Sequence, residues 1–218
     1  MSDKKSGFGS MAKLGLILAL YSLVASVGLA FVYNGTSRII AQRQQEDMEQ
    51  ALKELFYDAD SFMPITDISM PPQREGEPAV TIEGDANDPN NTGAFTAIKD
   101  GQIIGVALRT SRFSYSGPII ILTGVGTDRT IKGVKILENV DTPGLGSNAG
   151  SRTYYVDRAK GIHFYDQFTG KNVSDPFIPK QDVSAIAAAT ITSRAVASSV
   201  KAAGEAASAW LTANGGSR

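Results

Sequence analysis

The residues with the clearest chemical potential lie near the C-terminus, in the segment Ala188-Ala189-Thr190-Ile191-Thr192-Ser193. Its hydroxyl groups stand among small side chains, directly before an alanine-rich run that predicts a helix from Ser193 to Ala213. A helix N-terminus presents unpaired N–H groups and the positive end of the helix dipole, which favour an anion. A phosphate ester on Thr190 would be well placed there. The alternative is that Thr192 or Ser193 only caps the helix.

A second segment, Thr142-Pro143-Gly144-Leu145-Gly146, predicts a narrow loop. Pro143 fixes its own φ, while Gly144 and Gly146 allow the backbone to approach a ligand closely. Such a loop leaves room for a flat ring against Leu145. The alternative is an ordinary Pro-Gly turn.

Three segments, taken in chain order, resemble the FMN-binding domain family. Residues 114–119, Ser-Tyr-Ser-Gly-Pro-Ile, are similar to the family's Gly-Tyr-Ser-Gly turn, and residues 138–146 resemble its Glu-Thr-Pro-Gly-Leu-Gly loop. Residues 183–193 resemble its flavin-attachment segment, whose usual form is Asp-x-x-Ser/Thr-Gly-Ala-Thr. In that family the last Thr of this motif carries FMN through a phosphoester. The resemblance places the ester on Thr190.

The chain departs from the family pattern at several positions. Ser184 stands where the attachment motif has Asp, Ala187 replaces Ser or Thr, and Ala188 replaces Gly. Asp141 takes the place of the usual Glu before Thr142, and Asp182 is a candidate substitute for the missing carboxylate. If the backbone at Ala188 has a positive φ, its Cβ will resist that conformation.

The resemblance implies a cofactor-binding site with Thr190 as the covalent position, and no catalytic or metal-binding residue. The other members of the implied set are Ala189, Thr192, Ser193, Thr142, Pro143, Gly144, Leu145, Gly146, Tyr115, Ser116 and Gly117.

The implied function is that of an electron-transfer flavoprotein subunit in a membrane-bound, ion-translocating oxidoreductase of the Rnf type. Its covalently attached FMN would relay electrons between ferredoxin and NAD couples, and the subunit would not be catalytic on its own. The implied partners are the other subunits of the complex and a flavin transferase. Within the family, a subunit of a sodium-pumping NADH:quinone oxidoreductase is the alternative. Outside it, the alternative is a membrane-anchored noncovalent ligand-binding or assembly module without a redox cofactor.

Composition narrows the redox chemistry that this chain can carry. The 218 residues include no cysteine and a single histidine, His163, which we expect to be structural. Cysteine-ligated iron-sulfur clusters, covalent c-type haem and multi-histidine metal sites are therefore excluded, and a flavin is the economical redox centre. With 21 Lys and Arg against 22 Asp and Glu, the chain has no broad basic face for nucleic acid.

The run Leu14 to Tyr33 is uncharged and of the length needed to cross a bilayer core. Lys4, Lys5 and Lys13 precede it, so the positive-inside rule predicts a cytoplasmic N-terminus and a periplasmic or extracellular main domain. A cleaved signal peptide is the alternative, although the run is long for one.

The remainder predicts one α+β domain, with an antiparallel sheet flanked by helices, behind the single membrane span. The expected divisions are a cytoplasmic N-terminus (1–13), a transmembrane helix (14–33), a stalk helix (34–60) and the FMN-binding domain (61–218). Residues 60–91 are rich in proline and predict loops around one short strand. Strands are expected at 79–83, 93–99, 102–111, 119–125 and 130–138, with Asp100-Gly101 as a two-residue hairpin turn.

Overall fold

The computed structural model describes residues 4–73, 77–84 and 92–214. The chain divides into two compact units, residues 1–49 and 50–218. A single long helix, α1 (Lys4–Leu55), provides the first unit, and its last residues belong to the second.

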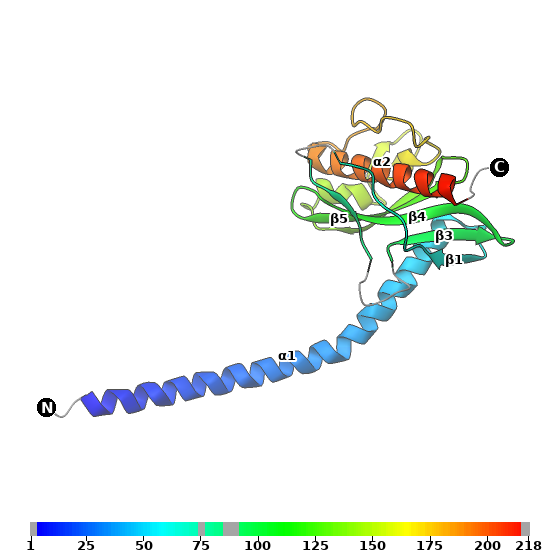
Figure 1. Cartoon of the computed structure of the whole chain (residues 1–218). Helices are drawn as coiled ribbons and strands as arrows, with labels where there is room; N and C mark the ends of the chain where they lie inside the picture. Colours follow the sequence, from blue (N-terminus) through cyan, green and yellow to red (C-terminus); the bar gives the residue numbers. More distant parts are fainter. Residues whose placement is uncertain (1–3, 74–76, 85–91, 215–218) are drawn as a thin grey trace. The chain divides into compact units, whose positions relative to one another are not determined.

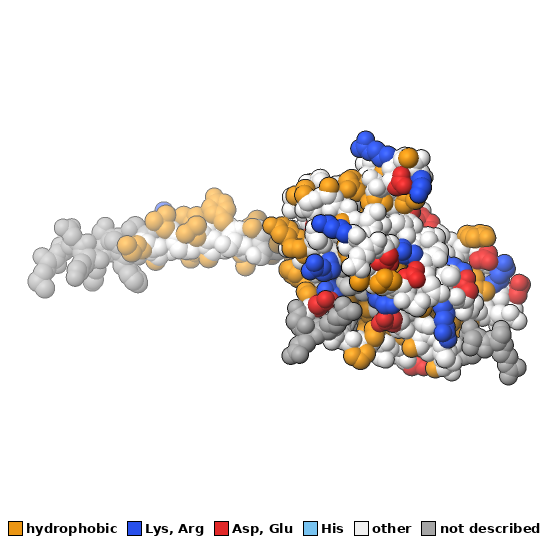
Figure 2. All heavy atoms as spheres, turned by 90° about the horizontal axis from the view of Figure 1, so that it is seen from above, with side chains coloured by type: hydrophobic (Ala, Val, Ile, Leu, Met, Phe, Trp, Pro, Cys, Tyr) orange, Lys and Arg blue, Asp and Glu red, His pale blue; other side chains and the backbone are white. Residues whose placement is uncertain are grey.

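The first unit carries the apolar run. Residues Met11–Tyr33 of α1 are long and apolar enough to cross a membrane, and none of this stretch is buried. Figure 2 shows hydrophobic side chains along the part of the helix whose side chains are described. This stretch contains the predicted span of residues 14–33, and the segment predicted as a stalk continues in the same helix as far as Leu55.

The second unit is built on a six-stranded antiparallel sheet, as the sequence predicted, with the strand order β1-β3-β4-β5-β6 and with β2 also paired to β4. The strands are β1 (Ser61–Pro64), β2 (Val80–Ile82), β3 (Ala94–Lys99), β4 (Gln102–Phe113), β5 (Pro118–Gly126) and β6 (Ile131–Asn139). The hairpin between β3 and β4 turns at Asp100 and Gly101, whose φ angles are 50° and 74°. Both are left-handed, as a tight two-residue turn between twisted strands requires.

Smaller elements follow the sheet before the C-terminal helix closes the domain. They are the 3₁₀ turns η1 (Gly146–Gly150) and η2 (Asp166–Phe168), the short pair β7 (Tyr155–Asp157) and β8 (Ile162–His163), and the helix α2 (Thr190–Ala213). Two expectations were wrong. Strand β1 lies in a region predicted to be loop, where it pairs with β3, and α2 begins at Thr190 instead of Ser193.

Helix α2 lies across one face of the sheet, over β4 and β5 (Figure 1). Its inward side is built from small residues such as Ala195, Ala203 and Ala207, all buried against the core. Small side chains let the helix axis approach the sheet closely, so large residues of the strands, including Leu108 and Ile121, fill the layer between them.

The opposite face of the sheet receives the end of α1. By the alternation of side chains along strands, Gly105, Gly124 and Gly133 face away from α2. A Cβ at Gly124 would lie 3.1 Å from the ring of Phe56, and one at Gly133 would lie 2.7 Å from Leu55 Cδ2. These glycines therefore form a groove that accommodates Leu55 and Phe56, and Phe56 is only 3% exposed.

Candidate functional site

A cavity of about 540 Å³ opens at the end of the sheet where the turn before β5 and the loop after β6 lie side by side. The strand pairing brings them together, because Ile119 pairs with Asn139. The N-terminus of α2 completes the wall. The lining residues are Tyr115, Asp141, Thr142, Leu145, Gly146, Ala188, Ala189, Thr190, Ile191 and Thr192. A volume of this size is in the range of about 300–1,000 Å³ that is typical of small-molecule and cofactor sites.

The carboxylate of Asp141 ties the three wall segments together. Its Oδ2 accepts hydrogen bonds from the hydroxyls of Ser114 and Thr192, each at 2.6 Å, and its Oδ1 accepts one from the backbone N–H of Ser116 at 2.7 Å. Asp141 is 4% exposed. Burial alone would raise its pKa, but the hydrogen bonds from Ser114, Thr192 and Ser116 outweigh burial and hold the pKa below its ordinary value.

The hydroxyls of the attachment segment differ sharply in their surroundings. Thr192 is buried and donates to Asp141, while Ser193 is buried, donates to Ala189 O at 2.9 Å and accepts the N–H of Ile186 at 2.9 Å. Thr190 is the first residue of α2, is exposed and lines the cavity. Among the described residues, no hydrogen bond uses its hydroxyl. Of the three, Thr190 is thus the one whose oxygen is accessible for modification.

The N-terminus of α2 has no side-chain cap. The residue before the helix is Ala189, which makes no capping hydrogen bond, and within the described part of the chain no side chain bonds to the N–H groups of the first turn. The expectation that Thr192 or Ser193 caps the helix was therefore wrong, because both lie inside it. An uncapped helix start at a cavity wall leaves donors that an anion can use.

Ala188, two residues before the first residue of α2, has a φ of 58°. This is the left-handed region, where a Cβ costs roughly 1–2 kcal/mol. The attachment motif of the FMN-binding family has Gly at this position, and glycine would adopt the same backbone without strain. The departure from the motif is thus a strained substitution in the cavity wall.

Gly146 leaves space that the wall needs. A Cβ there would lie 2.5 Å from Thr192 Oγ1 and 2.6 Å from Asp141 Oδ2, so any other residue would displace the contact between these two side chains. Gly144, two residues earlier, has a φ of 77° and nothing near its Cβ position. The loop of residues 142–146 thus uses one glycine for close packing and the other for a backbone turn.

The structure brings together most of the residues that the sequence singled out. Seven of them line the cavity: Tyr115, Thr142, Leu145, Gly146, Ala189, Thr190 and Thr192. The other five do not line it. Ser116 donates its N–H to Asp141, and the hydroxyl of Ser193 is used inside α2, where it donates to Ala189 O. The remaining three belong to the segments that form the wall: Gly117, Pro143 and Gly144.

The predicted cofactor-binding set did not include Asp141, Ala188 and Ile191, which also line the cavity, or Ser114, which donates to Asp141. Asp141 was noted only as a departure from Glu, because its burial and its distant hydroxyl partners cannot be seen in the sequence. Asp182, the candidate substitute carboxylate, does not line the cavity. It accepts hydrogen bonds from the N–H groups of Phe177 and Ile178 and pairs with Lys171.

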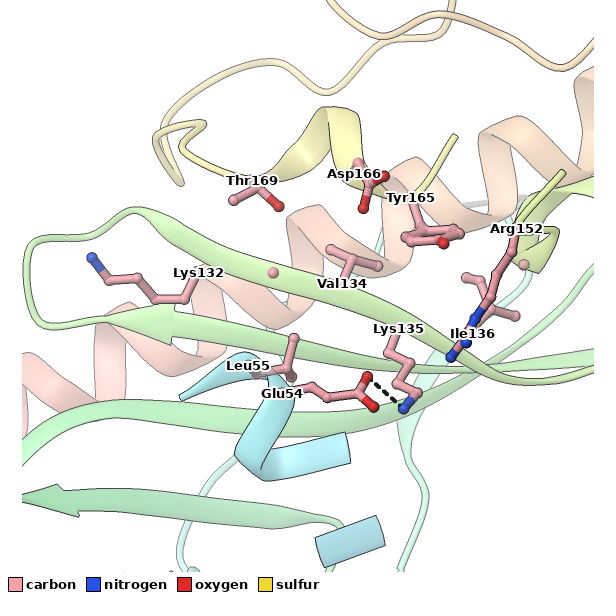
Figure 3. A pocket seen from close by; sticks show the side chains of 12 residues that line it. Glu54, Leu55, Lys132, Val134, Lys135, Ile136, Arg152, Tyr165, Asp166 and Thr169 are labelled. Carbon is pink, nitrogen blue, oxygen red and sulfur yellow. Dashed lines mark hydrogen bonds and ion pairs between the residues drawn. The ribbon is translucent and has the colours of Figure 1, made fainter. Parts of the chain in front are cut away.

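A second cavity, of about 310 Å³, lies between the end of α1, β6 and the segment around η2, and it shares no lining residue with the first (Figure 3). Two of its lining residues form an ion pair, in which Lys135 Nζ is 2.7 Å from Glu54 Oε2. The hydrogen bond from Lys135 holds the pKa of Glu54 below its ordinary value. This ion pair reinforces the packing of Leu55 and Phe56 against the sheet.

His163 lies away from the first cavity, in an aromatic stack. Its ring centroid is 4.4 Å from that of Tyr155 and 5.4 Å from that of Tyr165. Its Nδ1 is 2.7 Å from Asp166 Oδ2, and its Nε2 is 2.9 Å from the carbonyl oxygen of Arg152, to which it donates. Such an environment fits a structural histidine.

Comparisons with known proteins agree with this geometry. Residues 114–205, which contain every residue that lines the first cavity, match the model of the FMN-binding domain. Residues 1–55 match that of the RnfG N-terminal region. Residues 114–205 therefore match an FMN-binding domain, and FMN is its cofactor.

Among the relatives are proteins of ion-translocating complexes. The chain is 28% identical over 197 residues to the G subunit of the Na(+)-translocating ferredoxin:NAD(+) oxidoreductase complex of Acetobacterium woodii, covering 86% of this chain and 87% of the relative. It is 27% identical over 199 residues to the G subunit of the ion-translocating oxidoreductase complex of Methanosarcina acetivorans, covering 90% and 92%. The crystal structure of NqrC from Shewanella oneidensis aligns with a TM-score of 0.39 at 23% identity, covering 50% of this chain and 52% of that one.

Proposed function

We propose that this chain is the electron-carrying flavoprotein subunit of an Rnf-type ion-translocating oxidoreductase, with FMN esterified to Thr190. The observation that carries the proposal is the accessible Thr190 hydroxyl at the uncapped start of α2, in the wall of a cofactor-sized cavity. The names of the relatives support the assignment to a complex that couples ferredoxin and NAD.

The residues present fit FMN. The N–H groups of the first turn of α2 would hold the phosphate, since no side chain among residues 4–73, 77–84 and 92–214 bonds to them. Tyr115, Leu145 and Ile191 line the cavity and are 65%, 41% and 54% exposed, so they offer apolar surface to a ring and would exclude water from it. Close packing at Gly146 keeps the wall formed by Thr192 and Asp141 in place. Bound FMN supplies the capacity to accept and donate electrons one or two at a time.

Attachment requires one new bond. The Thr190 oxygen would bond to the phosphorus of an activated flavin phosphoanhydride, as the bond from that phosphorus to its leaving group breaks. The hydroxyl proton would pass to the transferase or to the leaving group. The product is a phosphodiester with a single negative charge, which the helix N-terminus stabilises. The isoalloxazine ring takes no part in the link.

The electrons must come from other subunits and return to them. The chain has no cysteine and one histidine, and among the described residues no group of three or more potential ligands could hold a metal ion. FMN would therefore be the single electron carrier of this chain, between the ferredoxin and NAD couples. The ion path would belong to the partner subunits. The other implied partner is the flavin transferase.

The proposed topology follows from the apolar helix and its flanking charge. Residues 14–33 would span the membrane, with Lys4, Lys5 and Lys13 keeping residues 1–13 in the cytoplasm. Residues 34–49 would form the stalk, and residues 50–218, which include the end of the predicted stalk, would form the FMN-binding domain on the periplasmic or extracellular side. A tether has a clear purpose there, because it prevents the loss of FMN from a compartment where the free cofactor is scarce.

The test is the full chain produced together with its flavin transferase. After denaturation, we expect flavin fluorescence in the gel band of the wild type and of the control Thr153→Ala, whose threonine is exposed and does not line the cavity. Thr190→Ala should be dark. A wild-type band without fluorescence or added mass would refute covalent attachment and favour the noncovalent ligand-binding or assembly module.

A further inference from the structure

Asp141 brings an unusual charge to the wall of the first cavity. Asp141 is 4% exposed and lines the cavity, yet the groups that donate to its carboxylate are hydroxyls and backbone N–H groups, all uncharged. Among the described residues, the ion pairs do not include Asp141, whereas Asp182 has Lys171 at 3.3 Å. Dipoles stabilise the charge of Asp141 without cancelling it.

We propose that the uncompensated carboxylate of Asp141 lowers the reduction potential of the flavin held in this cavity. The inference rests on the proposed function only in requiring FMN in this cavity. Two-electron reduction of a flavin, with one proton taken up from solvent, leaves the ring with one more negative charge than before. A fixed negative charge in the cavity wall opposes that gain, and the low dielectric of a buried site strengthens the opposition.

The hydrogen-bonding pattern permits a clean removal of the charge. In Asp141→Asn, the amide oxygen can take the place of Oδ1 and accept the N–H of Ser116. The amide N–H₂ then takes the place of Oδ2 and donates to the hydroxyls of Ser114 and Thr192, which rotate to accept. Each of the three contacts can thus be kept with its polarity rearranged, so this variant removes the charge with little change in shape.

A second variant tests the same idea with the opposite sign. Thr192→Val removes one of the two hydroxyl donors to Oδ2 and leaves the carboxylate in place. With one hydroxyl dipole fewer, the carboxylate produces a more negative electrostatic potential in the cavity. A role for Asp141 in merely holding the wall together predicts that both variants disturb the flavin in the same direction.

The experiment is a spectroelectrochemical titration of the FMN-loaded full chain in detergent, with electrons supplied by an electrode through mediator dyes at mildly alkaline pH. Flavin content is measured first, by in-gel fluorescence and intact mass. The matched control is Asp182→Asn, which removes a hydrogen-bonded carboxylate outside the cavity.

We expect a raised midpoint potential in Asp141→Asn, a lowered one in Thr192→Val and an unchanged one in Asp182→Asn. An unchanged or lowered potential in Asp141→Asn overturns the proposal. If Asp141→Asn fails to load FMN, an unchanged or raised potential in Thr192→Val overturns it in the same way. A wild-type chain that carries no flavin is a different result, because it refutes the proposed function itself.

Discussion

Ala188 offers a sharp test of the geometry at the candidate site, because its strain follows from one backbone angle. With a φ of 58°, its backbone is in the left-handed region, where the clash of its Cβ costs about 1–2 kcal/mol. Ala188→Gly removes that cost. Glycine also makes the unfolded chain more flexible, which offsets about 0.4–1 kcal/mol of the gain. The net expectation is a stabilisation of about 0.8 kcal/mol, within a range of roughly 0–1.6 kcal/mol.

The neighbouring residue provides the matched control. Ala187 is also exposed and small, but it is not among the residues with positive φ. Ala187→Gly therefore relieves no strain and should destabilise the domain by about 0.4–1 kcal/mol through the unfolded chain. The two substitutions add the same residue to the same loop, so the difference between them isolates the backbone angle.

The assay is thermal unfolding of the full chain in detergent, followed by the near-ultraviolet signal of the domain. For a domain of this size, about 1 kcal/mol corresponds to roughly 2–4 °C in the melting temperature. We expect Ala188→Gly to melt about 1–4 °C above the wild type and Ala187→Gly to melt below it. Equal melting temperatures for the two variants, or a lower one for Ala188→Gly, would show that the loop does not hold the left-handed conformation.

Three further predictions concern the packing and charge of the domain. Phe56→Ala should destabilise the domain by about 3–5 kcal/mol in denaturant unfolding, since it empties the glycine groove, whereas Tyr57→Ala, at a residue 90% exposed, should be nearly neutral. Asp141→Asn should cost about 1–3 kcal/mol at neutral pH. Because folding lowers the pKa of Asp141, the wild type should lose its extra stability over Asp141→Asn as the pH falls through the folded-state pKa. If the free energies of unfolding of the two proteins kept a constant difference down to acid pH, Asp141 would not be the charged, hydrogen-bonded group described here. Gly146→Ala should abolish flavin loading, because its Cβ would lie 2.5 Å from Thr192 Oγ1 in the cavity wall. Gly144→Ala should load flavin normally, at a stability cost of about 1 kcal/mol. Equal flavin loading by both variants would refute the close packing at Gly146.

The sheet could be predicted because its signals are local. The turn at Asp100-Gly101 and the apolar runs on either side determine the β3–β4 hairpin without reference to the rest of the chain. Strand β1 has no such signal, since only its pairing with β3 makes Ser61–Pro64 a strand. The prolines in and after this segment predict loop instead of strand.

The start of α2 was misplaced for a comparable reason. The usual signal for a helix start is a polar capping side chain, and here the residue before the helix is Ala189. The hydroxyl side chains of Thr192 and Ser193 are such a signal, and they predict a start at Ser193. Asp141 was missed as a site residue because its partners, Ser114 and Thr192, are 27 and 51 residues away in sequence. Only the assembled fold shows that these three side chains meet.

The central claim is that FMN is bonded to the oxygen of Thr190, and peptide mapping by tandem mass spectrometry tests it most directly. Trypsin cleaves after Lys180 and Arg194, which releases residues 181–194 as one peptide with the hydroxyls of Ser184, Thr190, Thr192 and Ser193. We predict that this peptide, from the full chain matured with its transferase, carries the mass of FMN less one water, and that fragment ions assign the added mass to Thr190. A peptide of unmodified mass, or fragment ions that place the flavin on another residue, would contradict the account.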